Sequence, residues 1–304
     1  MKKRNIVIIG GDKRQKYLKN YLLANGFEVS SYGLFDWDDE ENKLKSIIKN
    51  DSVIVLPLPA TRNDKTIVMP FSKKEITIDS IISHLGKENL VFGGIIKGEL
   101  LSRLRETEIP FVDYYNTSFV EKNAVLTAFG TLKIILEHID FALPMGKYAI
   151  TGYGKVAKEV SNLLTSLSCD VTVFARNPSQ QEDAKIKGCK AYSLYILQEN
   201  ISNYDFIINT IPSEVITEEI LQNIRTDAKI IELASAPYGV DFDLARKHNV
   251  HIVKAFGLPG KYTPKTAGEI IGKQIEEYLK WEGTQWKIKR WDSLCVVLFV
   301  PLKK

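Results

Sequence analysis

The stretch KYAITGYGKVAKEVSNLLTSLSCDVTVFAR, residues 147–176, decides the fold. Its first five residues have the character of a buried strand, and Gly152-Tyr153-Gly154-Lys155-Val156-Ala157 follows at once. Apolar residues then recur at the 3.6-residue spacing of a helix, and residues 170–174 alternate into a second strand. A strand, a glycine turn, a helix and a second strand in this order predict a Rossmann-type βαβ unit with the G-x-G-x-x-A fingerprint.

Each small residue of this turn has a physical role in dinucleotide binding. Gly152 permits the tight turn, Gly154 lets the backbone approach a pyrophosphate, and Ala157 lets helix and strand pack closely. The free N–H groups at the helix start, with the helix dipole behind them, favour an anion there. The alternative is a tight β–α turn that binds no ligand. The residues expected to hold the cofactor here are Gly152, Tyr153, Gly154, Lys155 and Val156.

The end of the second strand indicates which dinucleotide binds. An NAD site usually has Asp or Glu there, which accepts a hydrogen bond from the ribose 2′-OH. This chain has Arg176, followed by Asn177. A guanidinium can bind a 2′-phosphate with two charge-assisted hydrogen bonds, so the pair predicts NADP. If Arg176 instead stacks on adenine or faces water, NAD stays open.

The composition is that of an ordinary globular protein and excludes several classes. The chain has 304 residues, 44% hydrophobic and 26% charged, which is enough for two domains. A net charge of +4 without a basic stripe argues against nucleic-acid binding. Three scattered cysteines fit a reducing cytoplasm and offer no metal site. Residues 6–9 are too short for a signal peptide, and we expect no membrane span.

The N-terminal part repeats the same architecture without the full fingerprint. A strand at residues 5–9 ends in Gly10-Gly11-Asp12-Lys13-Arg14-Gln15, and a helix closing near Gly26 and a strand at residues 27–32 follow. Because Gly10-Gly11-Asp12 lacks the later small residue, we expect only the second unit to bind a dinucleotide. The acidic residues 36–41 are expected to form a solvated loop.

These patterns predict an α/β protein of two Rossmann-like, doubly wound parallel-sheet domains joined by a long helix. Residues 1–142 would be an N-terminal substrate or partner domain, and residues 143–262 the NAD(P)-binding domain. The joining helix is expected at residues 119–138. A C-terminal helix, residues 263–280, would return to the first domain.

Two further strand ends of the second domain lead into loops that should face the cofactor, because open α/β sheets bind ligands outside the carboxyl ends of their strands. One strand runs over residues 205–208 and another over residues 229–233. The loop residues predicted to touch the cofactor are Thr210, Ile211, Pro212, Ala234, Ser235 and Ala236.

The tail, residues 281–304, is atypical of the rest. It holds three of the four tryptophans, a seven-residue apolar run and five cationic against two anionic side chains, so it carries most of the net charge. We expect an extension outside the fold; a membrane-surface or partner-binding segment is the alternative.

Several loops resemble those of the dipicolinate synthase A-chain family, which belongs to spore-forming bacteria. The resemblance covers residues from about 4 to 280. The loops that carry it are residues 10–15, Asn209-Thr210-Ile211-Pro212-Ser213, residues 233–237, Gly257-Leu258-Pro259-Gly260 and Pro264-Lys265-Thr266-Ala267-Gly268.

That resemblance implies an NADP-dependent oxidation of dihydrodipicolinate to dipicolinate, on a branch of the lysine pathway. It also implies that the partner is a flavoprotein-like dipicolinate synthase B subunit, in the mother-cell cytoplasm during sporulation, and that the chains form a homo- or hetero-oligomer. The substrate carries two carboxylates, so cations should face the cleft; the candidates are Arg14, Arg62, Lys97 and Lys265. Arg14 and Lys265 lie inside the family-like motifs, whereas Arg62 and Lys97 can equally be surface cations.

Lys265 stands at the start of a helix, where a cation is disfavoured unless an anion lies beside it. We expect Lys265, the Thr266 hydroxyl and the helix N-terminus to hold one substrate carboxylate, with Arg14 on the other. Asn116 and Glu121, near the domain junction, could orient the ring or accept its proton, although Glu121 can equally be a first-turn residue favoured by the helix dipole.

Two other functions stay open at this point. The layout also resembles D-2-hydroxyacid dehydrogenases and adenosylhomocysteinases. The hydroxyacid enzymes use a histidine late in the second domain, and the loop at residues 257–268 has none, which weighs against that chemistry. The second alternative is a nucleotide-binding subunit whose partner completes the site.

Overall fold

The computed structural model describes residues 4–35 and 43–285. The acidic stretch at residues 36–41 and the predicted tail from residue 286 onward therefore lie outside the described residues. The chain divides into two compact units. Unit 1 runs to Val120 and resumes at Pro264, and unit 2 is Glu121–Thr263.

Unit 1 is built on a five-stranded parallel sheet in the order β2-β1-β3-β6-β7. Counted within the sheet this is the doubly wound order 2-1-3-4-5, whose switch point lies between β1 and β3. The central strands are buried on both faces, which is why their sequences are nearly continuous apolar runs. The strands are β1 (Ile6–Ile9), β2 (Val29–Tyr32), β3 (Val53–Val55), β6 (Leu90–Gly93) and β7 (Phe111–Asp113).

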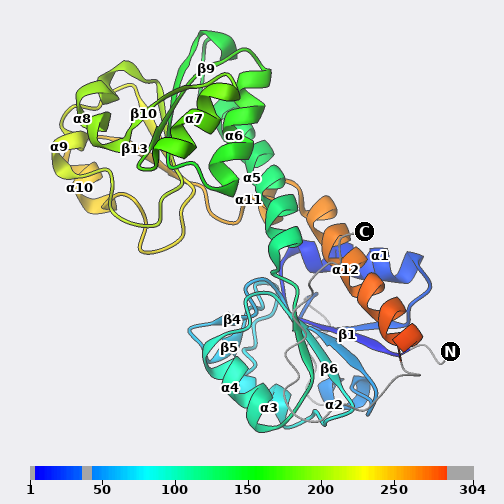
Figure 1. The fold of residues 1–304 in the computed structure, drawn as a ribbon. Helices are drawn as coiled ribbons and strands as arrows, with labels where there is room; N and C mark the ends of the chain where they lie inside the picture. The colour runs from blue at the N-terminus through cyan, green and yellow to red at the C-terminus, as the bar shows by residue number, and fades with distance from the viewer. Residues whose placement is uncertain (1–3, 36–42, 286–304) are drawn as a thin grey trace. The chain divides into compact units, whose positions relative to one another are not determined.

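Helices cover both faces of this sheet (Figure 1). Asp12 begins the first of them with a capping box: its amide donates to Gln15 Oε1, and its side chain accepts from the backbone of the first turn, the Arg14 amide included. The helices of unit 1 are α1 (Lys13–Ala24), α2 (Lys43–Ile47), α3 (Ile78–Ile82), α4 (Gly98–Glu106) and α12 (Pro264–Gln285).

Helix α12 packs along α1 in the same direction, and Figure 1 shows the two side by side. The approach is close because Gly268 lies against the backbone of Arg14 and Leu18, and Gly272 lies against the Tyr21 ring. Further along, the Tyr21 hydroxyl donates to Glu276 at 2.7 Å. The prediction that a late helix returns to the first domain is confirmed, and this helix runs five residues beyond the predicted end.

A hairpin that the sequence did not predict fills the first glycine turn. It is formed by β4 (Thr61–Arg62) and β5 (Thr66–Ile67), which pair antiparallel. Just after β5, the Val68 carbonyl accepts a 2.7 Å hydrogen bond from the Gly11 amide, and Met69 lies where a Cβ on Gly10 would stand. The turn after β1 is therefore occupied by the chain itself.

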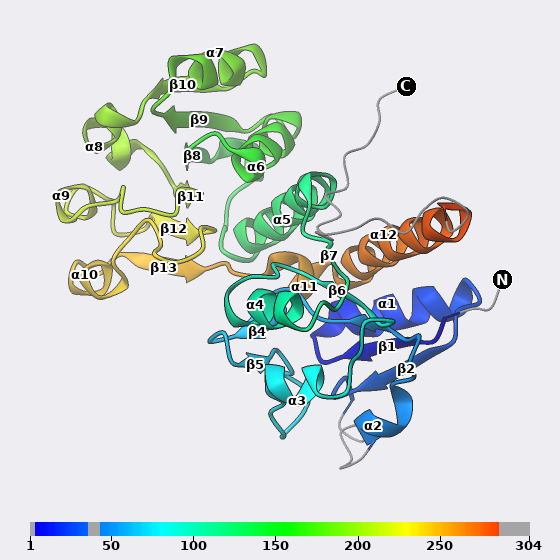
Figure 2. The ribbon, with the colours of Figure 1, turned by 60° about the horizontal axis from the view of Figure 1, so that its bottom comes forward.

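Unit 2 carries a six-stranded parallel sheet in the order β10-β9-β8-β11-β12-β13 (Figure 2). This is the Rossmann order 3-2-1-4-5-6, with its switch point between β8 and β11. The fold class predicted from the sequence, two Rossmann-like parallel-sheet domains, is confirmed. The strands are β8 (Lys147–Thr151), β9 (Asp170–Ala175), β10 (Lys190–Ser193), β11 (Phe206–Asn209), β12 (Lys229–Glu232) and β13 (His251–Lys254).

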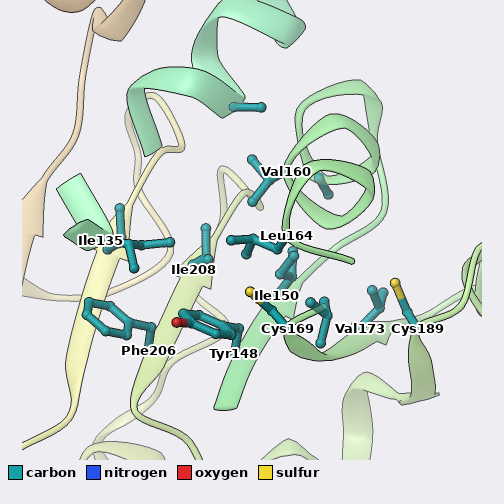
Figure 3. Close-up of a cluster of buried hydrophobic side chains, with 14 of the residues drawn as sticks. Ile135, Tyr148, Ile150, Val160, Leu164, Cys169, Val173, Cys189, Phe206 and Ile208 are labelled. Carbon is teal, nitrogen blue, oxygen red and sulfur yellow. The ribbon is translucent and has the colours of Figure 1, made fainter. Parts of the chain in front are cut away.

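The helices of unit 2 include the predicted long helix, which runs as α5 (Thr117–Glu137) and begins within the last residues of the first part of unit 1. On one face of the sheet, Val160 and Leu164 of α6 lie over Ile150 and Ile208 (Figure 3). A short helix, α11, interrupts the loop at residues 257–268, which the sequence analysis treated as irregular. The remaining helices are α6 (Lys155–Ser166), α7 (Pro178–Ile186), α8 (Leu197–Asn200), α9 (Glu218–Leu221), α10 (Phe242–Lys247) and α11 (Leu258–Tyr262).

Candidate functional site

The turn between β8 and α6 has the geometry of a dinucleotide cradle. Gly152 has a φ of +87°, and a Cβ there would stand 2.8 Å from Thr210 Oγ1 and from Ile211 Cγ1, so only glycine fits. Gly154 occupies the N-cap position of α6 without a side-chain cap, and a Cβ on it would meet nothing within 4 Å. Open space thus lies directly before an uncapped helix start, which is where a pyrophosphate binds.

The other residues of this turn are placed as the fingerprint requires. Tyr153 is 2% exposed and Ala157 is fully buried against the sheet, whereas Lys155 is exposed at the first position of α6. Lys155 pairs with Glu121 of α5 at 3.5 Å, so the predicted proton acceptor Glu121 lies beside the glycine turn within unit 2. Val156 is half-buried and packs against the core.

Arg176 is exposed at the end of β9, and its Nη2 atom lies 3.4 Å from the Ser213 hydroxyl. The guanidinium therefore faces the loop after β11. Asn177 caps α7, since its side chain accepts from the Ser179 amide at 2.9 Å. That bond commits the Asn177 oxygen to the helix and leaves Arg176 as the charged group at the ribose position.

A buried polar rung, Thr151–Asn209–Glu232, lies at the carboxyl ends of β8, β11 and β12. The three residues are directly opposite one another in the sheet register and none is exposed. Thr151 Oγ1 donates to Asn209 Oδ1 at 2.6 Å, and Asn209 Nδ2 donates to the Glu232 oxygens at 2.7 and 3.0 Å. This rung was not predicted from the sequence, although one polar residue closes each of three apolar strands.

The predicted cofactor loops are tied to this rung. The Thr210 hydroxyl donates to the Thr151 carbonyl at 2.7 Å, and the Ile211 amide donates to Asn209 Oδ1 at 3.1 Å. The Ala234 amide donates to Glu232 Oε1 at 2.9 Å. Pro212, Ser235 and Ala236 belong to the same loops, at the same edge of the sheet. The structure thus brings the predicted cofactor residues of unit 2 together around one switch point.

In unit 1, Arg14 is buried and bonded at the switch point of the sheet. Its Nε and Nη2 atoms donate to the Asp12 carboxylate at 2.9–3.1 Å, and Nη2 also donates to the Leu58 carbonyl. Arg14 therefore ties the turn after β1 to the loop after β3. Asp12 already uses one edge of the guanidinium, and the binding of a substrate carboxylate by Arg14 stays a prediction.

Lys265 and Thr266 lie in the first turn of α12, where Thr266 is exposed. Because Gly268 rests on the Arg14 backbone, the first turns of α1 and α12 lie next to each other, and Lys265 is exposed there like Thr266.

The Asn116 side chain accepts from the Phe119 amide at 3.0 Å and from Gln274 at 3.2 Å, so its oxygen caps α5. Two buried amide atoms of unit 1, Gln15 Nε2 and Gln274 Oε1, have no hydrogen-bond partner in the described chain.

The other two candidate cations lie on separate elements of unit 1. Arg62 is on β4 and lines a cavity of about 230 Å³ with Lys73, Lys74 and Glu75. Lys97 holds the N-cap position of α4 without a side-chain cap. Among the described residues there is no cluster of three or more His, Cys, Asp or Glu that could hold a metal ion. No helix within residues 4–35 and 43–285 is both long and apolar enough to cross a membrane.

The chain matches known proteins in both halves. Residues 5–115 match the N-terminal domain of the dipicolinate synthase A chain. The dipicolinate synthase A chain of Bacillus subtilis (strain 168) is 25% identical in an alignment 287 positions long, which covers 90% of this chain and 95% of that protein. The crystal structure of the dipicolinate synthase A chain from Bacillus halodurans has a TM-score of 0.79 at 27% identity and covers 91% of this chain and 98% of its own.

The chain is similar to these dipicolinate synthase proteins over most of its length. The resemblance inferred from the loops is thereby confirmed. Residues 140–258 match the NAD binding domain of D-isomer specific 2-hydroxyacid dehydrogenases, so unit 2 is a nicotinamide-dinucleotide domain of oxidoreductase type. The apo structure of D-lactate dehydrogenase from Escherichia coli has a TM-score of 0.57 at 14% identity and covers 92% of this chain and 97% of its own, a likeness of fold alone.

Proposed function

We propose that the protein is an NADP-dependent dehydrogenase that oxidises dihydrodipicolinate to dipicolinate. The observation that carries the proposal is that, within unit 1, Arg14 and Lys265 stand in the first turns of two helices that lie next to each other. An exposed lysine at a helix N-terminus suits a carboxylate, and the relatives from Bacillus carry the name of the product. Unit 2 contributes the dinucleotide turn that the oxidation needs.

The reaction removes two hydrogens from the ring. One leaves a ring carbon as a hydride with its electron pair, and the other leaves as a proton. A bound oxidised nicotinamide supplies the hydride acceptor. Because the ring becomes aromatic, the proton can pass to a weak base. Glu121, whose carboxylate is exposed and paired with Lys155, is such a base, and water is another.

NADP rather than NAD follows from the cation at the ribose position. The sequence after β9 is Arg176-Asn177-Pro178-Ser179, without a carboxylate to repel a 2′-phosphate, and the exposed Arg176 guanidinium makes a long contact, 3.4 Å, with the Ser213 hydroxyl. An exposed guanidinium can change its rotamer and bind a phosphate with two parallel hydrogen bonds. This choice also fits Asn177, whose amide nitrogen stays available beside the helix start of α7.

The two carboxylates of the substrate would be bound unequally. Lys265, Thr266 and the N–H groups at the start of α12 would hold the first. Arg14 would reach the second only with Nη1, because Asp12 and Leu58 take its other donors. The Asn116 oxygen caps α5, so an orienting role toward the ring would fall to its amide nitrogen.

The relatives are named as one part of a larger enzyme, which supports a second chain as partner. We propose a dipicolinate synthase B subunit, which would join this chain in the mother-cell cytoplasm during sporulation. A nucleotide-binding chain completed by that partner is the rival function. The hydroxyacid-dehydrogenase alternative is less favoured, since the loop at residues 257–268 contains no histidine.

The test is NADPH formation, followed by absorbance, when the isolated chain receives NADP and dihydrodipicolinate made in the same tube. Formation of NADPH together with dipicolinate supports the proposal. NADPH formation only after the B subunit is added would favour the rival function. No turnover with either preparation, or turnover of 2-hydroxy acids instead, would contradict it.

A further inference from the structure

The Thr151–Asn209–Glu232 rung buries a carboxylate in the sheet of unit 2. Glu232 is fully buried at the end of β12. Burial raises the pKa of this carboxyl, while hydrogen bonds from Asn209, Ala234 and Gly239 oppose that shift. A buried charge is costly unless hydrogen bonds satisfy it, so a carboxylate at this position needs a physical reason.

The neighbours of Glu232 suit an ionised carboxylate. Oε1 accepts from Asn209 and the Ala234 amide, and Oε2 accepts from Asn209 and the Gly239 amide, at 2.7–3.2 Å. All four contacts are N–H donors. A glutamine would turn an amide NH₂ toward two of these donors and leave them unsatisfied.

The same contacts fix the loop after β12 at both of its ends. The Ala234 amide, just after the strand, donates to Glu232 Oε1. The Gly239 amide, at the far end of the loop, donates to Glu232 Oε2. Gly239 has no room for a side chain, because a Cβ would overlap the Asn209 amide. Ala234, Ser235 and Ala236 are held between these two anchors.

The rung reaches the other two cofactor loops through Asn209. Its Nδ2 donates to the Ile211 carbonyl at 3.0 Å and its Oδ1 accepts from the Ile211 amide at 3.1 Å. Thr151 immediately precedes Gly152, whose turn rests on Thr210 and Ile211. Each of the three loops that face the cofactor thus begins one or two residues after a member of the rung.

We propose that Glu232 is a positioning residue. Its carboxylate acts through Asn209 and Thr151 to hold the three cofactor loops of unit 2 in the arrangement that binds the dinucleotide. The inference rests on the proposed use of a nicotinamide dinucleotide. It adds that affinity for the cofactor depends on a buried charge that does not touch it. Small displacements of binding groups weaken binding and turnover steeply, up to about a hundredfold for 1 Å.

The experiment compares Glu232→Gln with Glu199→Gln, an exposed glutamate of α8 in the same unit. We expect Glu232→Gln to raise the dissociation constants of NADP and NAD at least about tenfold, as loss of one charge-assisted contact predicts. The Michaelis constant for the cofactor should rise more than kcat falls, and Glu199→Gln should match wild type. Hydrogen exchange should speed up at the amides of residues 210–213 and 233–239, and strand β8 should stay protected.

Thr151→Val keeps the inference testable if Glu232→Gln does not fold, because it preserves shape and removes only the bond to Asn209. About fivefold weaker dinucleotide binding is expected. Unchanged affinity in Thr151→Val, or in a folded Glu232→Gln, would overturn the inference while the wild-type cofactor use stands. A wild-type chain that binds neither dinucleotide would overturn the proposed function and the inference with it.

Discussion

At the scale of single residues, Arg176 decides between the two dinucleotides. Arg176→Asp should weaken NADP and spare or improve NAD, because the carboxylate repels a 2′-phosphate and accepts from a 2′-OH. Loss of one charge-assisted pair is worth about 1.5–3 kcal/mol, or roughly ten- to a hundredfold in affinity. Dissociation constants for both dinucleotides measure the effect. An unchanged preference in the variant would remove Arg176 from the ribose site.

Gly154 separates cofactor binding from folding. A Cβ at this position meets nothing within 4 Å, so Gly154→Val should fold with a normal unfolding temperature. The branched side chain would nevertheless fill the space that a pyrophosphate needs, and dinucleotide binding should fall below detection by calorimetry. Gly86→Val is a matched control, because a Cβ on Gly86 also meets nothing within 4 Å. Normal NADP binding by the folded variant would argue against the cradle.

Lys265 tests the proposed carboxylate site. Lys265→Met should raise the Michaelis constant for the substrate about tenfold or more and leave the affinity for NADP alone, since the change lies in unit 1. Lys273→Met, an exposed lysine two turns along the same helix, is the control. Equal Michaelis constants in the two variants would show that Lys265 is an ordinary surface cation.

The sequence predicted these residues unevenly, for physical reasons. The glycine turn is local, so Gly152, Gly154 and Ala157 could be interpreted from spacing alone. Glu232 and Asn209 stand 23 positions apart and meet only because parallel pairing sets them opposite each other. Arg14 was predicted to bind a substrate carboxylate, and its bond to Asp12, two residues before it, was not predicted although Asp12 and Gln15 have the spacing of a capping box.

At the scale of elements, the contact between α1 and α12 includes a polar tie from the Tyr21 hydroxyl to Glu276. Burial, and then the bond to Glu276, raises the pKa of Tyr21 to about 12, and hydrogen bonds from Lys280 and then Tyr21 lower the pKa of Glu276. The tie needs an ionised Glu276 and a neutral Tyr21. Its contribution is therefore full between the unfolded values of about 4.5 and 10, and it is lost below and above that window.

Tyr21→Phe should lower the free energy of unfolding of unit 1 by about 1.5 kcal/mol at pH 7. The difference from wild type should shrink as the pH falls below about 4 and again as it rises toward 12. Denaturant titration followed by tryptophan fluorescence measures it, because Trp281 packs on Tyr278 within unit 1 and the sequence of unit 2 contains no tryptophan. Tyr17→Phe, an exposed residue of the same helix, is the control. A difference that does not change with pH would mean the tie is not ionic.

The helices and strands themselves were largely predictable, since apolar runs and 3.6-residue spacing are local. The β4–β5 hairpin is an exception. It consists of two strands of two residues each, too short to show any periodicity. Its packing over Gly10 and Gly11 depends on Val68 and Met69, far along the chain. The filling of the first turn therefore depends on tertiary contacts that the sequence does not show. The absence of a third small residue in that turn can be seen in the local sequence.

At the scale of the molecule, the two units should be separable. Helix α12 gives unit 1 the large buried side chains of Ile271, Ile275 and Tyr278, which pack with the strands of its sheet. Each contributes about 1.5–3 kcal/mol, and the sum is comparable to the whole stability of a domain. A chain that stops at Thr263 should therefore keep NADP binding by unit 2 and lose the folded structure of unit 1.

Limited proteolysis with mass spectrometry measures that outcome: fragments should arise throughout residues 4–120, while Glu121–Thr263 resists cleavage. Supplying α12 as a separate peptide should restore part of the protection. Equal resistance of both units in the shortened chain would mean that α12 is dispensable to the core, against the packing of Gly268 and Gly272 on α1.

The placement of α12 also has a consequence for how the protein is made on the ribosome. Synthesis is vectorial, and domains generally fold as units as they emerge. Strand β1 is synthesised early, but helix α12, which covers part of the same core, is synthesised only after the whole of unit 2. Unit 2 is continuous in sequence and can fold during translation. Until α12 is made, the apolar surface of unit 1 that packs against α12 stays exposed to solvent. Chaperone demand should accordingly be greatest before Pro264 leaves the exit tunnel.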